Sequence, residues 1–251
     1  MPWEASPWLL LVVFVAGIAG GFANVVAGGG SLVTVPALIL TGVPETVANG
    51  TSRLGIMLQN FVAVWRYRKA GILPKGILAL IVPTLFGAAL GVLLAIWVGD
   101  AGFRKIFAGI MLVWAVAVAL RPDIDFSKPP PPRLPSWAVS LLLFLIGIYG
   151  GMIQAAVGYL LLALFTFGMG MPLKQANVLK IVVVCAYMPL AFLLFAVNGK
   201  VDWLLGALLS GGQIVGAWLG AGVVIGGGTG VMRIILIIAV IFGALELLGV
   251  I

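Results

Sequence analysis

Histidine is absent from this 251-residue sequence, and cysteine occurs once, at Cys185. The lack of histidine removes the commonest metal ligand and general base of proteins. A single cysteine excludes an internal disulfide and any site built from several thiolates. The sequence therefore predicts no catalytic residues, no metal and no cofactor, and it argues against an enzyme.

Charged residues are also rare. Charged residues make up 8% of the chain and hydrophobic residues 63%, with a mean hydropathy of +1.26. About a quarter of the residues of a soluble globular protein are charged, so the composition indicates an integral membrane protein. The net charge of +7 comes mostly from short loops between apolar segments. Such loops are basic for reasons of membrane topology, so the charge does not indicate nucleic-acid binding.

Apolar segments account for most of the chain and set the expected fold. A helix needs about 20 apolar residues to span a membrane, and two further segments are too short to do so upright. We predict an all-α, polytopic transmembrane bundle with about 8 long helices and two short broken or re-entrant segments. The long segments are 8–27, 47–65, 72–98, 103–120, 137–157, 178–197, 203–225 and 231–250, and the short ones are 31–41 and 158–167.

The two halves of the chain resemble each other. A polar, proline-rich linker at 122–136 separates a predicted first transmembrane repeat, 1–121, from a second, 137–251. The matches keep their order and need only small gaps, so we predict a duplication of the kind found in secondary transporters. Displacement by 130 pairs Gly17, Gly20, Gly21 and Gly28 with Gly147, Gly150, Gly151 and Gly158; by 128 it pairs Pro44 and Asn49 with Pro172 and Asn177; by 129 it pairs Gly87 and Gly91 with Gly216 and Gly220.

The positions of the basic residues favour repeats of opposite orientation. If each half crosses five times, counting its short segment, Arg66, Arg68, Lys69 and Lys174 fall on one side with most other loop cations, and Lys200 falls on the other. With four crossings per half, the separation is weaker. Because basic loops are cytoplasmic, we expect inverted repeats with the loop at 66–75 inside.

A glycine turn interrupts the first half where its short segment begins. Gly28, Gly29 and Gly30 allow a tight turn, and Ser31 is the expected N-cap of the helix that follows. The free N–H groups of a helix N-terminus suit an anion. Close helix packing explains the same glycines equally well, so both interpretations stay open. The GxxxG pairs, such as Gly17 with Gly21 and Gly147 with Gly151, are predicted to pack helices.

Cations inside two predicted membrane helices are the strongest candidates for a site. Asn49, Ser52 and Arg53 share one helical face, with Thr51 beside them, and Asn177 and Lys180 occupy the corresponding face of the second half. A cation in a membrane helix costs at least about 2.5–3.5 kcal/mol, so it indicates function unless the side chain extends to the interface.

Buried amides supply a second set of candidates. Asn24 and Gln154 precede the two irregular turns in corresponding positions, and an amide can donate to an oxyanion without adding charge. Amides also bond simply to neighbouring helices, so both roles stay open, and Gln59 and Asn60 are weaker ligand candidates. Glu246 is the one carboxylate within a long apolar segment.

Several ordered motifs together resemble the TauE/SafE family of membrane permeases, often called sulfite exporters. The motifs are GGGSLVTVP and TGVPETVANGTS in the first half, and GIYGGMIQAAVGYLLLALFTFGMGMPLKQANVLK with NGKVDW in the second. The resemblance implies movement of sulfite, sulfonates or related small anions across the bacterial cytoplasmic membrane. It places the substrate at the 28–31 turn and at the Asn49–Arg53 and Asn177–Lys180 faces. Many relatives carry a glycine-rich turn in both halves, whereas here the second keeps only Gly158.

We therefore expect a multi-pass secondary transporter for a small sulfur-containing oxyanion, working by alternating access between two repeats. Its expected partners are the anion, the lipid bilayer and a coupling ion, either a proton or sodium, and a homo-oligomer is compatible with the sequence. A non-transporting assembly or scaffold subunit is the main alternative, and a membrane-embedded enzyme the weaker one.

Overall fold

The structure is a computed structural model that describes residues 7–74, 76–120, 131 and 134–227. All regular secondary structure in that part of the chain is helical, as the composition predicts. The helices are α1 (Pro7–Val26), α2 (Ser31–Ile39), α3 (Glu45–Lys69), α4 (Leu78–Leu120), α5 (Ser136–Met152), α6 (Val157–Ala163), the π-helical turn η1 (Leu164–Gly168), α7 (Leu173–Val197) and α8 (Trp203–Ile225).

Four of these helices are long and apolar enough to span a membrane: Pro7–Val26, Leu78–Phe103, Leu173–Val197 and Trp203–Ile225. The predicted segments 72–98 and 103–120 correspond to two helical arms of α4, which meet at a kink where the backbone of Gly99 is not helical (φ 70°, ψ 179°). The short predicted segments correspond to α2 and to α6 with η1. The predicted segment 231–250, with Glu246, and most of the linker 122–136 lie outside the described residues.

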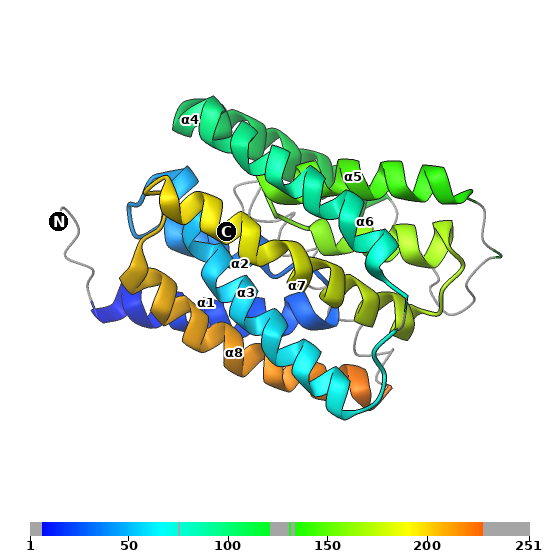
Figure 1. Ribbon diagram of the computed structural model, residues 1–251. Coiled ribbons are helices and arrows are strands. Elements are labelled where there is room, and N and C mark those ends of the chain that lie inside the picture. The colour runs from blue at the N-terminus through cyan, green and yellow to red at the C-terminus, as the bar shows by residue number, and fades with distance from the viewer. Residues whose placement is uncertain (1–6, 75, 121–130, 132–133, 228–251) are drawn as a thin grey trace.

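The helices lie in three tiers (Figure 1). The pair α1–α8 forms one outer tier and α4–α5 the other, with α3 and α7 between them. Each outer pair joins a helix from the first half of the chain to one from the second. The halves are therefore interwoven rather than two separate bodies.

Glycines make these outer pairs possible because they let two backbones touch. A Cβ added to Gly212 would lie 2.2 Å from the Phe14 carbonyl oxygen, and one added to Gly87 would lie 2.1 Å from the Phe144 carbonyl oxygen. Phe14 and Phe144 are 130 residues apart, as the sequence predicts for α1 and α5. The GxxxG pairs are thus confirmed as packing surfaces.

The same contacts correct the predicted correspondence between α4 and α8. Gly87 contacts α5 as Gly212 contacts α1, and Gly91 contacts Ile148 as Gly216 contacts Ile18. The displacement is therefore 125, and the pairing of Gly87 with Gly216 was wrong by four residues, about one helical turn. Glycines recur every fourth residue along α8, so the sequence pattern looks the same after a slip of one turn.

The central helices α3 and α7 run in opposite directions. Near the start of α3, a Cβ on Gly50 would meet the Lys200 carbonyl oxygen at 2.0 Å and the Phe195 ring at 3.0 Å, both at the far end of α7. At the other end, Arg66 donates to the Trp218 carbonyl oxygen, and Lys174 donates to the Ile225 carbonyl oxygen at 2.9 Å. The end of α3 and the start of α7 therefore both lie at the C-terminal end of α8.

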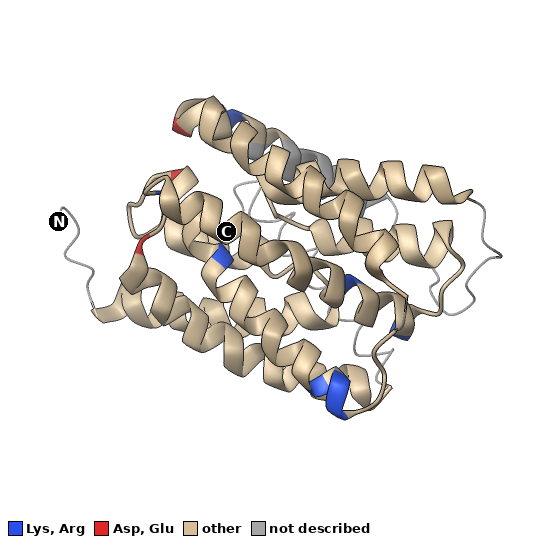
Figure 2. Cartoon of the chain, viewed as in Figure 1, with Lys and Arg blue, Asp and Glu red and all other residues tan. Residues whose placement is uncertain are grey.

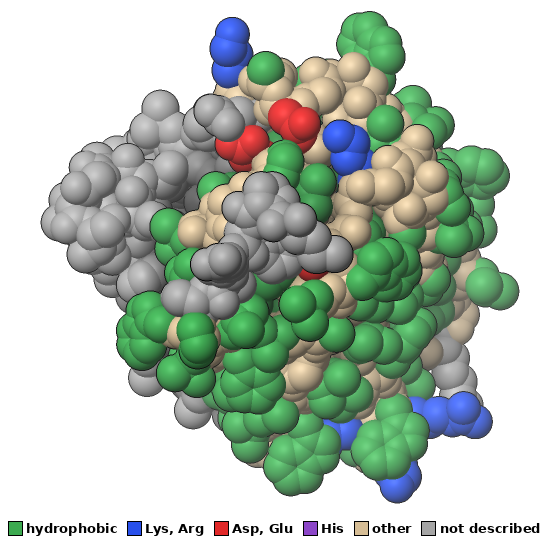
Figure 3. Space-filling model, turned by 90° about the vertical axis from the view of Figure 1, so that its left-hand side faces the viewer, with side chains coloured by type: hydrophobic (Ala, Val, Ile, Leu, Met, Phe, Trp, Pro, Cys, Tyr) green, Lys and Arg blue, Asp and Glu red, His purple; other side chains and the backbone are tan. Residues whose placement is uncertain are grey.

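Most of the charged residues that the structure describes lie toward the two ends of the bundle (Figure 2). At one end, which we call the acidic end, Asp100 accepts from the backbone N–H and the hydroxyl of Thr46 and lies 3.8 Å from Lys200. Arg66, Arg68, Lys69 and Lys174 mark the basic end. Figure 3 shows hydrophobic side chains covering much of the surface between charged groups. Exposed tryptophans lie near both ends, among them Trp8, Trp97 and Trp203 at the acidic end and Trp65 and Trp137 at the basic end.

The close contact between α4 and α5 leads to a stability prediction. Gly91→Ala places a methyl group 2.0 Å from the Ile148 carbonyl oxygen, and such overpacking typically costs about 1–3 kcal/mol. We expect a lower midpoint of thermal unfolding in detergent for this variant. Gly109→Ala, also in α4, is the control because its Cβ would meet nothing within 4 Å. Equal midpoints for the two variants would contradict the proposed packing role.

Candidate functional site

The two irregular turns of the chain meet each other. Gly28, at φ +107°, packs closely on Gly158. A Cβ added to Gly28 would lie 2.7 Å from the Cα atom of Gly158, and one added to Gly158 would lie 2.4 Å from the Cα atom of Gly28. These are the two glycines that the predicted repeat pairs with each other. Their close contact gives a physical reason for a glycine at position 158, because a side chain there would clash with Gly28.

The other two glycines of the triplet also pack against protein. A Cβ on Gly29 would lie 2.1 Å from the Tyr159 hydroxyl, and one on Gly30 would lie 1.9 Å from the Gly20 carbonyl oxygen. Ser31 was predicted to cap α2, but Gly30 occupies the N-cap position without a side-chain bond. The Ser31 hydroxyl instead donates to the Gln154 carbonyl oxygen at 3.1 Å. The turn thus joins the two halves.

Arg53 is fully buried in α3 and binds the end of α5. Its two terminal nitrogens donate to the carbonyl oxygens of Gly150, at 3.1 Å, and Gly151, at 2.7 Å. Asn49, one turn earlier, donates to the Met152 carbonyl oxygen at 2.9 Å and accepts from Arg53 at 3.4 Å. The last carbonyls of a helix have no partner within the helix, so Asn49 and Arg53 cap α5.

Lys180 and Asn177 of α7 cap the C-terminal end of α1 in the same way. The Lys180 ammonium donates to the Asn24 carbonyl oxygen at 3.0 Å and to the Asn177 side-chain oxygen at 2.6 Å. The Asn177 amide donates to the Val25 carbonyl oxygen at 2.9 Å. Both carbonyls belong to the last residues of α1, and Lys180 is 1% exposed.

Each amide-plus-cation face therefore binds the C-terminal end of a helix from the opposite half of the chain: α3 binds α5, and α7 binds α1. The C-terminus of a helix carries a partial negative charge, equivalent to about half an elementary charge, which favours a cation. That charge does not neutralise a full cation. Among the described residues, no carboxylate is a partner of Arg53 or Lys180. The part of the chain that the structure describes thus supplies no acidic counterion to either of these two buried basic side chains.

The remaining predicted site residues have structural partners. The Thr51 hydroxyl accepts from the Asp202 backbone N–H at 2.8 Å, and the Ser52 hydroxyl donates to the Asn49 carbonyl oxygen at 2.9 Å. Asn24 contributes its backbone oxygen to Lys180. Gln154, at φ 66°, accepts from the Tyr187 hydroxyl at 2.9 Å through its side-chain oxygen. The structure thus brings Asn49 and Arg53 together, whereas Thr51 and Ser52 serve other contacts.

Two aromatic residues at the site were missed in the sequence. The Phe195 ring lies 4.6 Å from the Arg53 guanidinium carbon, a cation–π contact. Tyr187, fully buried, bonds Gln154 and lies seven residues after Lys180 on α7. That spacing of two helical turns was the available signal for Tyr187. Phe195 offered none, because it meets Arg53 only through tertiary packing.

Comparison with known proteins identifies the family. The family described as Sulfite exporter TauE/SafE matches residues 13–247. The chain belongs to the TauE/SafE family. A probable membrane transporter protein of Haemophilus influenzae is 30% identical over 234 residues, which cover 92% of this chain and 91% of the relative.

Two further relatives of this TauE/SafE protein carry similar names. The probable membrane transporter protein ORF9 of a Sinorhizobium species is 29% identical over 96% of this chain and 93% of its own length. The probable membrane transporter protein YfcA of Escherichia coli K12 is 26% identical over 93% of this chain and 87% of its own. Together with the apolar helices, the family identifies an integral membrane protein of a transporter family, which agrees with the prediction of a protein that is not an enzyme.

The capping role of Asn177 in this TauE/SafE protein can be measured directly. Asn177→Ala leaves the Val25 carbonyl unpaired and removes an acceptor from Lys180, and an unsatisfied buried group costs about 1–3 kcal/mol. We expect a lower unfolding midpoint in detergent. Asn198→Ala is the matched control, because Asn198 also donates to a carbonyl oxygen of α7 but is exposed. A midpoint for Asn177→Ala as high as that of the control would rule out the capping role.

Proposed function

We propose that this protein is a secondary transporter that moves a small sulfur-containing oxyanion, such as sulfite or an organosulfonate, across the bacterial cytoplasmic membrane by alternating access. The observation that supports an anion as substrate is the pair of buried cations, Arg53 and Lys180, whose partners in the described chain are all neutral. Removing one charged partner of a buried pair is strongly destabilising. A pair of cations with no such partner is therefore suited to an anion that arrives and leaves.

Arg53 also keeps a free donor for that anion. Its Nε atom is buried and has no hydrogen-bond partner within the described residues. Lys180 uses two of its three N–H groups on Asn24 and Asn177. An oxyanion accepts from several donors at once, so these N–H groups suit sulfite or a sulfonate better than a weakly accepting anion such as chloride.

The caps hold the cations in place without neutralising them. Carbonyl dipoles at the ends of α1 and α5 offset part of the cost of burying each cation. The Asn49 and Asn177 side chains fix the direction of the charged groups. The geometry thus favours two charged positions, one from each half, between which the anion moves.

Inverted repeats around this site are part of the proposal. Support comes from the antiparallel α3 and α7 helices, and from the reciprocal caps. The described cations support the same topology: Arg66 and Lys174 lie at one end of α8, and Lys200 pairs with Asp100 at the other. Since basic loops are cytoplasmic, the basic end would face the cytoplasm. Exchange between two such orientations is how inverted repeats give alternating access.

The charges of Arg53 and Lys180 can be tested by flux. Arg53→Gln and Lys180→Gln keep a donor for the helix ends but remove the charge. A hydrogen bond to a charged group contributes about 1.5–3 kcal/mol, so we expect uptake of labelled sulfite or sulfoacetate into proteoliposomes to fall roughly ten- to hundredfold.

Lys105→Gln is the control, because Lys105 is an exposed cation on α4. Uptake by all three variants at the wild-type rate would disprove the site. A chemically altered product, or no flux in the wild type with any anion tested, would disprove the transporter itself.

The orientation can be tested with single cysteines in a Cys185→Ala background. Arg68 and Asn198 are both exposed and lie at opposite ends of the bundle. We expect a membrane-impermeant maleimide to label Asn198→Cys on intact cells and Arg68→Cys only after permeabilisation. The reverse pattern would place the basic end outside, and labelling of both residues from one side would disprove the proposed topology.

A further inference from the structure

Asn60 of α3 is a buried amide that makes no hydrogen bond with any described residue. Its side chain is fully buried, and both its nitrogen and its oxygen lack a partner. A buried amide without partners is costly, and more so where no water is available. Such a group has a physical reason to persist if it binds something that the protein chain does not supply.

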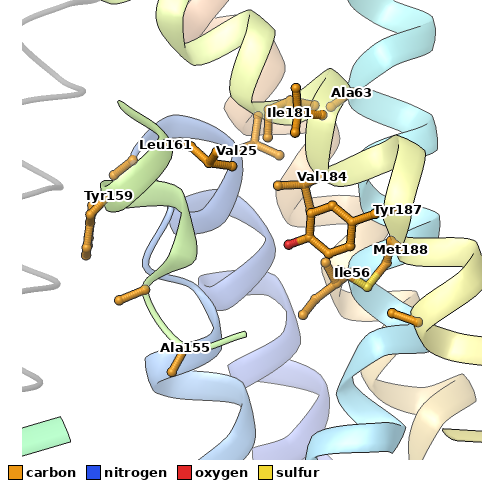
Figure 4. Packing of buried hydrophobic residues seen from close by; sticks show 14 of the residues in the cluster. Val25, Ile56, Ala63, Ala155, Tyr159, Leu161, Ile181, Val184, Tyr187 and Met188 are labelled. Atoms are coloured by element: carbon orange, nitrogen blue, oxygen red, sulfur yellow. The ribbon is translucent and has the colours of Figure 1, made fainter. Parts of the chain in front are cut away.

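The position of Asn60 follows from the helical repeat of α3. Asn49, Arg53, Ile56, Asn60 and Ala63 are spaced by three or four residues, so they lie along one face. Asn60 is seven residues beyond Arg53, which corresponds to about 10 Å along the helix axis. This face points at α7, because Ile56 lies beside Tyr187 and Met188, and Ala63 lies beside Ile181 (Figure 4).

These neighbours place Asn60 between the two cations. Arg53 stacks on Phe195, toward the end of α7. Lys180 precedes Ile181, the neighbour of Ala63, toward the start of α7. Since α3 and α7 are antiparallel, a path along their interface from Arg53 to Lys180 passes Asn60.

The residue that corresponds to Asn60 in the second half is Met188, at a displacement of 128. Met188, Ile181 and Val184 are all buried, apolar residues of α7. Packing of α3 on α7 therefore does not require an amide at this level. The side chains of Gln59 in α3 and Gln213 in α8 are also buried without a hydrogen-bond partner among the described residues. They belong to the face of α3 that packs on α8, since the Gln213 side-chain oxygen lies against Gly55.

We propose that Asn60 is a substrate-contacting residue, which binds the oxyanion in transit between Arg53 and Lys180. The inference rests on the proposed transport function and extends it to a third, uncharged position. The amide has two N–H donors for the oxygen atoms of the anion, and its carbonyl accepts from a water or from a protonated oxygen of the anion. A neutral donor at the midpoint lets the anion leave each cation without losing all of its hydrogen bonds.

Asn60→Leu tests the inference because leucine has a similar shape and no polar atom. We expect the flux of labelled sulfite or sulfoacetate in proteoliposomes to fall roughly tenfold, while the unfolding midpoint stays equal or rises. The matched control is Met188→Leu, which is expected to keep both wild-type flux and wild-type stability.

The outcomes separate this inference from the function on which it rests. Wild-type flux that Asn60→Leu leaves unchanged overturns the role of Asn60 and leaves the transporter intact. No wild-type flux of sulfite, sulfate or sulfoacetate overturns the proposed function itself. A fall in flux that comes with a lower unfolding midpoint indicates a structural role and overturns the inference.

A second variant decides the question if Asn60→Leu does not fold. Asn60→Cys, in a Cys185→Ala background, is treated with a small maleimide with and without saturating sulfoacetate; sulfite is avoided because it reacts with maleimides. Slower modification in the presence of sulfoacetate supports the contact. An unchanged rate overturns it, provided that the same protein transports sulfoacetate.

Discussion

The structure depends on the capping of two broken helices by cations from the opposite half of the chain. α1 and α5 end inside the bundle, where water cannot satisfy their last carbonyl groups. Arg53 and Asn49 satisfy α5, and Lys180 and Asn177 satisfy α1. This one requirement explains why an amide and a cation occur together in each half.

The same contacts connect stability with function. A cation that caps a helix is held at a fixed point and cannot extend to the membrane surface, so its charge stays available inside. Neutral carbonyl partners stabilise that charge less than a carboxylate would. The two cations thus attach the halves of the chain to each other, while their charge is only partly neutralised where an anion is proposed to bind.

Much of the architecture could be predicted from the sequence, because it follows from local patterns. Segment length and apolar content predicted the helices, and GxxxG spacing predicted that their glycines pack helices, although it did not show which helices pair. The amide-plus-cation faces were visible from helical spacing. The 129-residue displacement failed because a glycine at every fourth position cannot distinguish one helical turn from the next.

Other features of the site were invisible because they depend on tertiary contacts. The sequence showed Arg53 and Lys180 as parallel features of two repeats, and it did not show that each binds the other repeat's helix. Ser31 looked like a cap for its own helix, whereas it bonds to Gln154 across the molecule. Phe195 has no sequence signature at all. The glycine triplet had two interpretations; its contacts with Gly158, Tyr159 and Gly20 support the packing role, and the anion site stays a prediction.

The reciprocal caps also bear on how the protein is made. The bond from Lys180 to the Asn24 carbonyl joins residues 156 positions apart. At about 5–20 residues per second, α1 would wait on the order of ten seconds or more for its partner during synthesis. Until then its terminal carbonyls need other partners, such as water, lipid headgroups or the insertion machinery. The N-terminal half therefore gains its native cap of α1 only when α7 has been made.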